Sequence, residues 1–184
     1  MKFIFTGIFI LFILSGVFGA DVPICKIHGI VQQAVTSSLQ IEFDHPYILT
    51  KKVTFPIYLE RDNTFELEFQ LNQPVFCRLI CGAHMIDLYV EPGNNLGVFF
   101  TGENIEESVF DGNGELHNVF LQEYAKNFSK DDRFKLHSCS RDNMEKNFQF
   151  LKDEKNNKEQ FILNYPKEKF VRWSPQFVKA IRGD

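Results

Sequence analysis

The chain contains few of the short motifs that mark catalysis or cofactor binding. None of its four cysteines forms the C-x-x-C pair of a thioredoxin-type redox site. A G-x-S-x-G nucleophile elbow is absent as well. Strong zinc sites have paired, closely spaced ligands, whereas the stretch His137-Ser138-Cys139 would need a distant partner such as His117 or His45. The sequence therefore predicts no catalytic residue, no cofactor and no metal site in this chain.

An excess of positive charge is also absent. The 184 residues include 20 Lys and Arg against 24 Asp and Glu, which gives a formal net charge of −4. Charges of both signs are mixed along the chain, apart from the Lys-rich run 152–158. Because nucleic-acid binding depends on a surplus of basic charge, we expect no nucleic-acid partner.

Only one apolar run approaches the length of a membrane span, and it lies at the N-terminus. Lys2 precedes the apolar residues 3–14, and small residues dominate 15–20. This order is typical of a secretory signal peptide, residues 1–20, cleaved after Gly19 or Ala20. An uncleaved anchor is the alternative, because residues 3–20 are barely long enough to span a bilayer. Both interpretations predict a periplasmic or secreted protein that meets the membrane only through this segment.

The four cysteines are Cys25, Cys77, Cys81 and Cys139. Cys77 and Cys81 stand four residues apart on a predicted strand, which places them about 13 Å apart on one face. This separation is too large for a disulfide. Another pair could form a bridge in an oxidising compartment, but we favour buried thiols that act as small apolar side chains.

Phenylalanine is abundant, with 21 residues, and apolar side chains alternate with polar ones between residues 27 and 100. The stretch TFELEFQL, residues 64–71, shows this period of two most clearly. Turn-forming residues separate the alternating segments. The expected strands lie at 27–33, 38–43, 53–59, 64–71, 75–81, 85–91 and 96–100. The pattern predicts a mainly β fold with some α, an antiparallel β-sandwich or barrel of six to seven strands followed by a helical segment.

The stretch FDGNGELHNVFLQEY, residues 110–124, resembles two ligand-binding loops but fits neither. A dinucleotide-binding loop has a third glycine, where this chain has His117. A calcium loop has a glycine at its sixth position and a glutamate at its twelfth, where this chain has Leu116 and Gln122. The two glycines therefore indicate a sharp turn into a helix.

Three helices are predicted after this turn. The first covers about 115–128, with Asn113-Gly114 as its start and a capping side chain there. The second covers 142–163, and Ser174-Pro175 opens a third by cap and first-turn proline. These patterns divide the chain into a signal peptide (1–20), a β-rich module (21–106) and a helical extension (107–184). The last helix is short, so we expect the chain to be truncated before a further domain.

A family resemblance rests on three segments, FELEFQLNQPVFCRLICGAHMIDLYVEPGNNLGVFF (65–100), VFDGNGELHNVFLQEY (109–124) and WSPQFVKAI (173–181). Together they resemble the N-terminal region of envelope thioredoxin-like proteins of Gram-negative bacteria. These proteins are of the alkyl-hydroperoxide-reductase and thiol-disulfide-interchange type. The likeness covers residues 27–182 and includes WSPQFVKAI near the end of the chain. In the first segment, Asn94 replaces the family's usual acid. The matching residues are Tyr89, Pro92, Gly93 and Leu96 in a turn, and Phe110, Gly112, Gly114, Asn118, Phe120 and Leu121 at a helix start.

This resemblance implies a role without catalysis. In the family, a β-rich module and a helical segment precede a thioredoxin fold with a W-C-x-x-C site, which this chain lacks. The chain would then be the non-catalytic N-terminal module of an exported thiol-disulfide oxidoreductase, positioning a C-terminal thioredoxin-like domain or a protein partner. The parent protein would be the enzyme. Residues Pro92, Gly93, Gly112, Gly114 and Asn118 would shape the turn and the helix start.

The alternative function is a self-standing secreted β-sandwich that binds a small ligand or a protein. Phe76, Ile80 and Tyr89 form a candidate interaction face, because they lie opposite the side chains predicted for the core. The helical segment could equally cover this face. A third and weaker alternative, a hydrolase, would need Ser, His and an acid converging in a polar pocket. The predicted core side chains are Cys77, Leu79, Leu88 and Val90.

Overall fold

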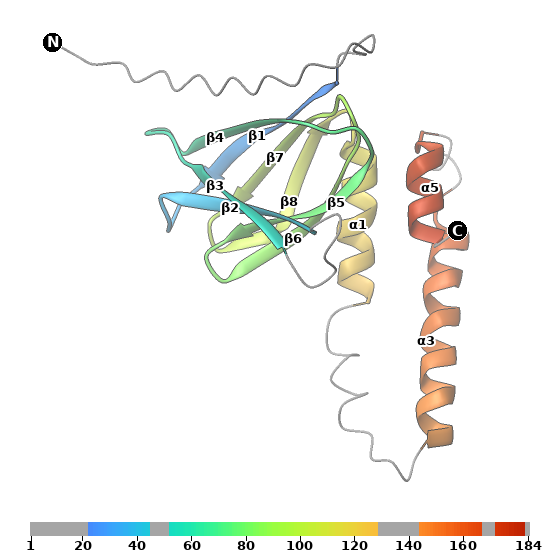
Figure 1. The fold of residues 1–184 in the computed structure, drawn as a ribbon. Coiled ribbons are helices and arrows are strands. Elements are labelled where there is room, and N and C mark those ends of the chain that lie inside the picture. Colours follow the sequence, from blue (N-terminus) through green and yellow to red (C-terminus); the bar gives the residue numbers. More distant parts are fainter. Residues whose placement is uncertain (1–21, 45–51, 129–143, 167–171, 183–184) are drawn as a thin grey trace, which may run out of the picture.

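A computed structural model describes residues 22–44, 52–128, 144–166 and 172–182. These residues form eight strands and three helices (Figure 1). The strands are β1 (Ile24–Gln32), β2 (Ser38–Asp44), β3 (Lys52–Tyr58), β4 (Thr64–Gln70), β5 (Val75–Cys81), β6 (His84–Val90), β7 (Asn95–Thr101) and β8 (Asn104–Gly112). The helices are α1 (Glu115–Asn127), α3 (Met144–Asn164) and α5 (Pro175–Arg182).

The strands form two four-stranded sheets that pack face to face. One sheet has the order β4-β1-β7-β8 and the other has the order β3-β2-β5-β6. The predicted sandwich is confirmed, and the two sheets do not close into a barrel. Neighbouring strands are antiparallel except β1 and β7, which run parallel. Between these two strands the chain forms β2, β3, β5 and β6 of the second sheet and β4 of the first.

The core between the sheets follows the alternation of the sequence. In β4, Phe65 is buried while Glu66 and Glu68 face solvent, because successive side chains of a strand point to opposite faces. The four core positions predicted on β5 and β6 are all buried. The buried members of this sandwich core are Cys25, Ile27, Val31, Leu39, Ile41, Ile57, Phe65, Cys77, Leu79, Cys81, Ile86, Leu88, Val90, Leu96, Val98, Phe100, Ile105 and Phe110.

Strand β8 is the element that the sequence prediction missed. Its buried residues Ile105, Ser108 and Phe110 do not keep a strict period of two. The pairing of β7 with β8 shifts register between Phe99 and Thr101, and such a bulge moves one side chain to the other face. The predicted boundary at residue 106 therefore falls inside a strand, and the sandwich continues to Gly112.

The three predicted helices are confirmed to within two residues at the ends that the prediction specified. For α5, the Ser174 hydroxyl accepts a hydrogen bond from the Phe177 N–H at 3.0 Å, which is the predicted cap. The expected side-chain cap of α1 is wrong. Its N-cap is Gly114, with φ 110° and no side-chain bond. The Asn113 Oδ1 instead accepts from the Asn95 N–H at 2.9 Å, because Asn113 directly follows Gly112, which pairs with Leu96 of β7.

A second apolar cluster lies among the helices, which are arranged with α1 against the sandwich and α3 and α5 beyond it (Figure 1). Phe120 of α1 is at its centre, with ring centroids 4.9 Å from Tyr165 and 4.8 Å from Trp173. Aromatic pairs at such distances contribute more than their buried area alone. The buried members of this helical cluster are Tyr89, Phe120, Tyr165, Trp173 and Phe177.

Two glycine-containing turns meet where β6 ends and α1 begins. In the first, the Asn94 N–H donates to the Glu91 carbonyl at 3.0 Å, with Pro92 next and Gly93 at φ 80°. This is the geometry of a type II turn, which requires a positive φ at its third residue. In the second turn Gly112 has φ 87°. A Cβ atom on Gly112 would lie 2.1 Å from the Asn95 carbonyl oxygen.

Several sequence predictions concern residues that lie outside the described part of the chain. These are the signal peptide, Cys139, the stretch 137–139 as a metal ligand, and His45. Within the four described ranges, none of the helices combines the length and apolar composition of a membrane span.

Replacing Gly112 by alanine should destabilise the protein more than the same change at Gly82. Both glycines have positive φ, but a Cβ at Gly82 has its nearest neighbour 3.8 Å away. Gly82→Ala should therefore cost only the conformational penalty, about 1 kcal/mol. Gly112→Ala adds a backbone clash and should lower the free energy of unfolding by about 3 kcal/mol. Urea denaturation of both variants measures this difference, and equal losses would contradict it.

Candidate functional site

Helix α1 lies across the open side of the sandwich. Strands β6 and β8 are edge strands of their sheets, and both contact α1. An edge strand leaves a row of backbone N–H and C=O groups without strand partners. Burying such groups beneath a helix is costly unless the helix supplies hydrogen bonds.

Asn118 supplies those bonds to β6. Its Oδ1 accepts from the Tyr89 N–H at 2.8 Å, and its Nδ2 donates to the Tyr89 carbonyl at 3.0 Å. The same Nδ2 donates to the Gly114 carbonyl at 2.9 Å in the first turn of α1. Asn118 is fully buried. One side-chain amide therefore replaces a neighbouring strand for one residue of β6.

Gln122, one helical turn further along α1, provides a hydrogen bond to β8. Its Nε2 donates to the Ser108 carbonyl at 2.8 Å. Residues four apart share one face of a helix, so Asn118 and Gln122 together attach α1 to both sheets. Between them, Val119 packs against the sandwich core.

Helix α5 docks on the same junction through aromatic rings. Phe177 is fully buried, and its ring centroid lies 4.8 Å from Tyr89 and 4.4 Å from His117. Tyr89 is only 1% exposed. The helices therefore cover the Tyr89 end of the candidate interaction face. Phe76 remains 41% exposed, and Ile80 is half-buried.

Polar contacts fix Ser174, the residue that caps α5. The Ser174 hydroxyl bonds the Glu91 carboxylate in the turn after β6. The Ser174 N–H donates to His117 Nε2 at 3.2 Å. These contacts join residues 83 and 57 positions apart in the chain. The start of α5 is thus held by both the sandwich and α1.

Burial controls the protonation of this cluster. It raises the pKa of the Tyr89 hydroxyl, and the Glu91 carboxylate raises it further. Burial also lowers the pKa of His117, and Glu91 partly opposes that effect. His117 is therefore neutral near pH 7, with its proton on Nδ1 because Nε2 accepts from Ser174. Among the described residues, His117 Nδ1 is buried without a hydrogen-bond partner.

A serine, a histidine and an acid thus converge, but their bonds do not form a catalytic triad. A nucleophilic serine donates its hydroxyl proton to the histidine. Here the Ser174 hydroxyl instead bonds the Glu91 carboxylate and caps α5, while His117 accepts from a backbone N–H. These three residues fasten the helix, and the geometry gives the hydrolase alternative no support.

The described cysteines are also structural. Cys25, Cys77 and Cys81 are buried free thiols. Burial strongly raises the pKa of Cys77, and the Asp87 carboxylate adds to the effect. Burial raises the pKa of Cys81 as well. Because the thiolate is the reactive form, these thiols are poor nucleophiles.

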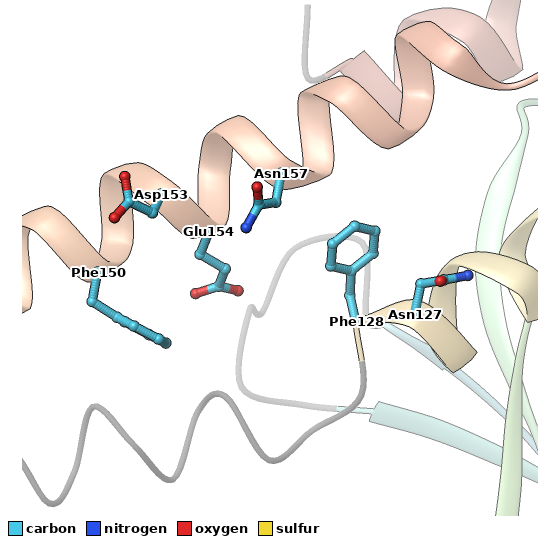
Figure 2. A pocket seen from close by; sticks show the side chains of 6 residues that line it. All are labelled: Asn127, Phe128, Phe150, Asp153, Glu154 and Asn157. Carbon is cyan, nitrogen blue, oxygen red and sulfur yellow. The ribbon is translucent and has the colours of Figure 1, made fainter.

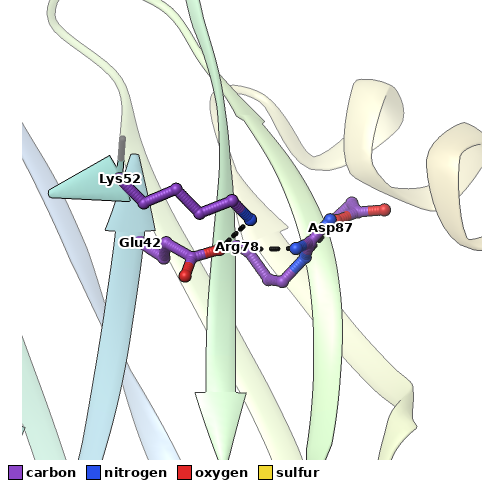
Figure 3. Close-up of polar contacts among 4 residues, drawn as sticks. All are labelled: Glu42, Lys52, Arg78 and Asp87. Carbon is purple, nitrogen blue, oxygen red and sulfur yellow. Dashed lines mark hydrogen bonds and ion pairs between the residues drawn. The ribbon is translucent and has the colours of Figure 1, made fainter. Parts of the chain in front are cut away.

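A row of charges crosses the outer face of the β3-β2-β5-β6 sheet (Figure 3). Arg78 bonds Asp87 at 2.9 Å and Glu42 at 3.3 Å, and Lys52 also pairs with Glu42. The first three residues are direct cross-strand neighbours, where opposite charges are favourable. Phe76, with its ring 5.0 Å from Tyr89, borders this charged row.

A hollow of about 320 Å³ lies between the end of α1 and α3 (Figure 2). Glu154 in its wall is already paired with Lys158. Among the described residues, no three His, Cys, Asp or Glu side chains come together as metal ligands. The hollow is lined by Asn127, Phe128, Phe150, Asp153, Glu154 and Asn157.

Comparisons with protein-family models, with curated proteins and with solved structures return no match for this chain.

Some of the residues at this junction were predicted from the sequence, and others were not. Pro92, Gly93 and Gly112 lie in the two turns, Gly114 is the N-cap of α1, and Asn118 lies in its first turns. Gln122, His117 and the pair Ser174–Glu91 were not foreseen. The spacing of two amides four residues apart on an apolar helix was the one available signal for Gln122.

Removing the Asn118 amide should destabilise the protein strongly. Asn118→Ala leaves the Tyr89 N–H and C=O buried without partners, which should lower the free energy of unfolding by about 3 kcal/mol. The matched control is Asn127→Ala on the same helix, where an exposed amide bonds the Glu123 carbonyl. That change should cost less than about 0.5 kcal/mol. Chemical denaturation measures both, and comparable losses would show that the edge of β6 needs no partner.

Proposed function

We propose that this chain is the non-catalytic, exported module of a thioredoxin-like thiol-disulfide oxidoreductase. Its role is to hold the redox domain, or a protein partner, in a fixed orientation. The observation that carries this proposal is the attachment of α5 to both α1 and the turn after β6 through Ser174, His117 and Glu91.

The residues behind the family resemblance support the same role. They are separated in the sequence but gather at one junction in the fold. The Asn118 side chain bonds the backbone N–H and C=O of Tyr89. Gly112, two residues before Gly114, lies against the Asn95 carbonyl. Shared residues at this junction would preserve the angle between the sandwich and the helices. An angle of this kind matters for a module that positions another domain.

The state of the thiols supports a role without chemistry of its own. The three described cysteines are buried, and those with shifted pKa values are shifted away from the reactive thiolate. Disulfide exchange needs an accessible thiolate. The redox site would therefore lie on the attached domain or on the partner.

The native polypeptide tests this proposal. We expect its intact mass to exceed the 21.5 kDa of the 184 residues, and its peptides to include a W-C-x-x-C sequence. With dithiothreitol as the electron donor, it should accelerate the reduction of insulin disulfides, whereas the 184-residue chain should not. Native protein with alkylated cysteines is the control. A native mass that matches this chain, with or without its first 20 residues, would refute the assignment.

A self-standing binding module is the second candidate function. It is favoured by the 41% exposure of Phe76 beside the charged row of Glu42, Arg78 and Asp87. In that case Phe76→Ser would abolish partner binding without lowering stability. Under the positioning role, the same variant would leave insulin reduction by the native polypeptide unchanged.

A further inference from the structure

The buried imidazole of His117 lies at the contact between α5 and the rest of the protein. Its side chain packs beside the rings of Tyr89 and Phe177, at centroid distances of 5.6 and 4.4 Å, and these two rings also contact each other. Its Nε2 accepts the Ser174 N–H at 3.2 Å, in the residue that caps α5. A nitrogen that accepts this bond cannot also carry a proton.

We propose that His117 makes the docking of α5 depend on pH. A proton taken up from solvent at Nε2 removes the acceptor of the Ser174 N–H and places a charge on an imidazole that is buried beside Tyr89 and Phe177. Helix α5 and Trp173 then leave the junction, while the sandwich stays folded. This inference is independent of the proposed function, since it concerns the helix contact alone.

Among the described residues, Glu91 is the charged group that shifts the pKa of His117. Lys179 and Arg182 of α5 are exposed. The Glu91 carboxylate favours the imidazolium, so it limits the effect of protonation. The other titratable or charged groups on the described segments around His117 are His84, Asp87 and Tyr89 of β6, Glu115, Glu123, Tyr124 and Lys126 of α1, Tyr165 after α3, and Arg172 before α5.

The direction of the pH effect follows from the lowered pKa of docked His117. Docked His117 binds a proton less readily than free histidine, whose pKa is about 6.5. Its contribution to docking is therefore complete above about pH 6.5 and is lost as the pH falls towards the docked pKa. Between these two pKa values, the ratio of docked to released α5 falls about tenfold per pH unit.

The separation of the two apolar clusters keeps the release local. The sandwich core contains neither Phe177 nor Trp173, which belong to the helical cluster. Asn118 and Gln122 attach α1 through amides that do not titrate. Helix α5 can therefore leave without removing any residue from the core between the sheets.

Trp173 reports this release directly, because it is the only tryptophan in the chain and is 6% exposed. We would record its emission and acrylamide quenching in the full chain from pH 8 to pH 4.5, with far-UV circular dichroism in parallel. We expect a reversible red shift and a several-fold rise in quenching below pH 6.5, with the strand signal retained. Unchanged emission, or loss of the strand signal in the same step, would overturn the proposal.

Two variants assign the step to His117. His117→Gln cannot titrate and should abolish the step, whereas His84→Gln, on an exposed residue of β6, should leave it unchanged. Glu91→Gln should move the step to higher pH. If the step persists in His117→Gln, the proposal is wrong.

A measurement on the unaltered chain covers the case in which His117→Gln does not fold. NMR titration of the imidazole ring of His117 should follow the same midpoint as the indole signal of Trp173. Different midpoints for the two rings would refute the proposal.

Discussion

The side-chain amide of Asn118 is the contact on which the arrangement of sandwich and helices depends. It offers a donor and an acceptor with the spacing of a peptide unit, and it meets both backbone groups of Tyr89 at 2.8 and 3.0 Å. Edge strands need such a partner once they are covered. Because this partner belongs to α1, satisfying β6 also fixes the helix. The opposite side of α1 then carries Phe120, around which the other helices gather.

Two apolar clusters result, and Tyr89 lies where they meet. Its strand neighbours Leu88 and Val90 belong to the sandwich core, whereas Tyr89 belongs to the helical cluster. The period of two along β6 thus divides one strand between two cores. The helical cluster can change without loss of the sandwich, and for this reason a single histidine at its contact surface is able to act on α5 alone.

The chemical character of the junction explains why we propose a positioning role for it. Serine, histidine and glutamate meet there, but the Ser174 hydroxyl bonds the Glu91 carboxylate and caps α5, while His117 accepts from a backbone N–H. The described thiols are buried. Similar residue types would indicate catalysis if the serine hydroxyl donated to the imidazole. The donors and acceptors that are used hold α5 to α1 and to the sandwich. Their most direct effect is to fix the direction of α5.

The sequence by itself determined the local elements. Seven strands followed from alternation, three helices from apolar spacing and caps, and the tight turns from Gly93 and Gly112, because these signals are encoded within a few neighbouring residues. Only the tertiary structure decided the rest. The bulge beside Phe99 interrupts the alternation of β8, and the pairing of β8 with β7 gives Asn113 a partner in β7 instead of α1. The contacts that bury Tyr89 and the hydrogen bonds of Ser174 join residues up to 83 positions apart. Such contacts depend on how complete elements pack, which no short stretch of sequence encodes.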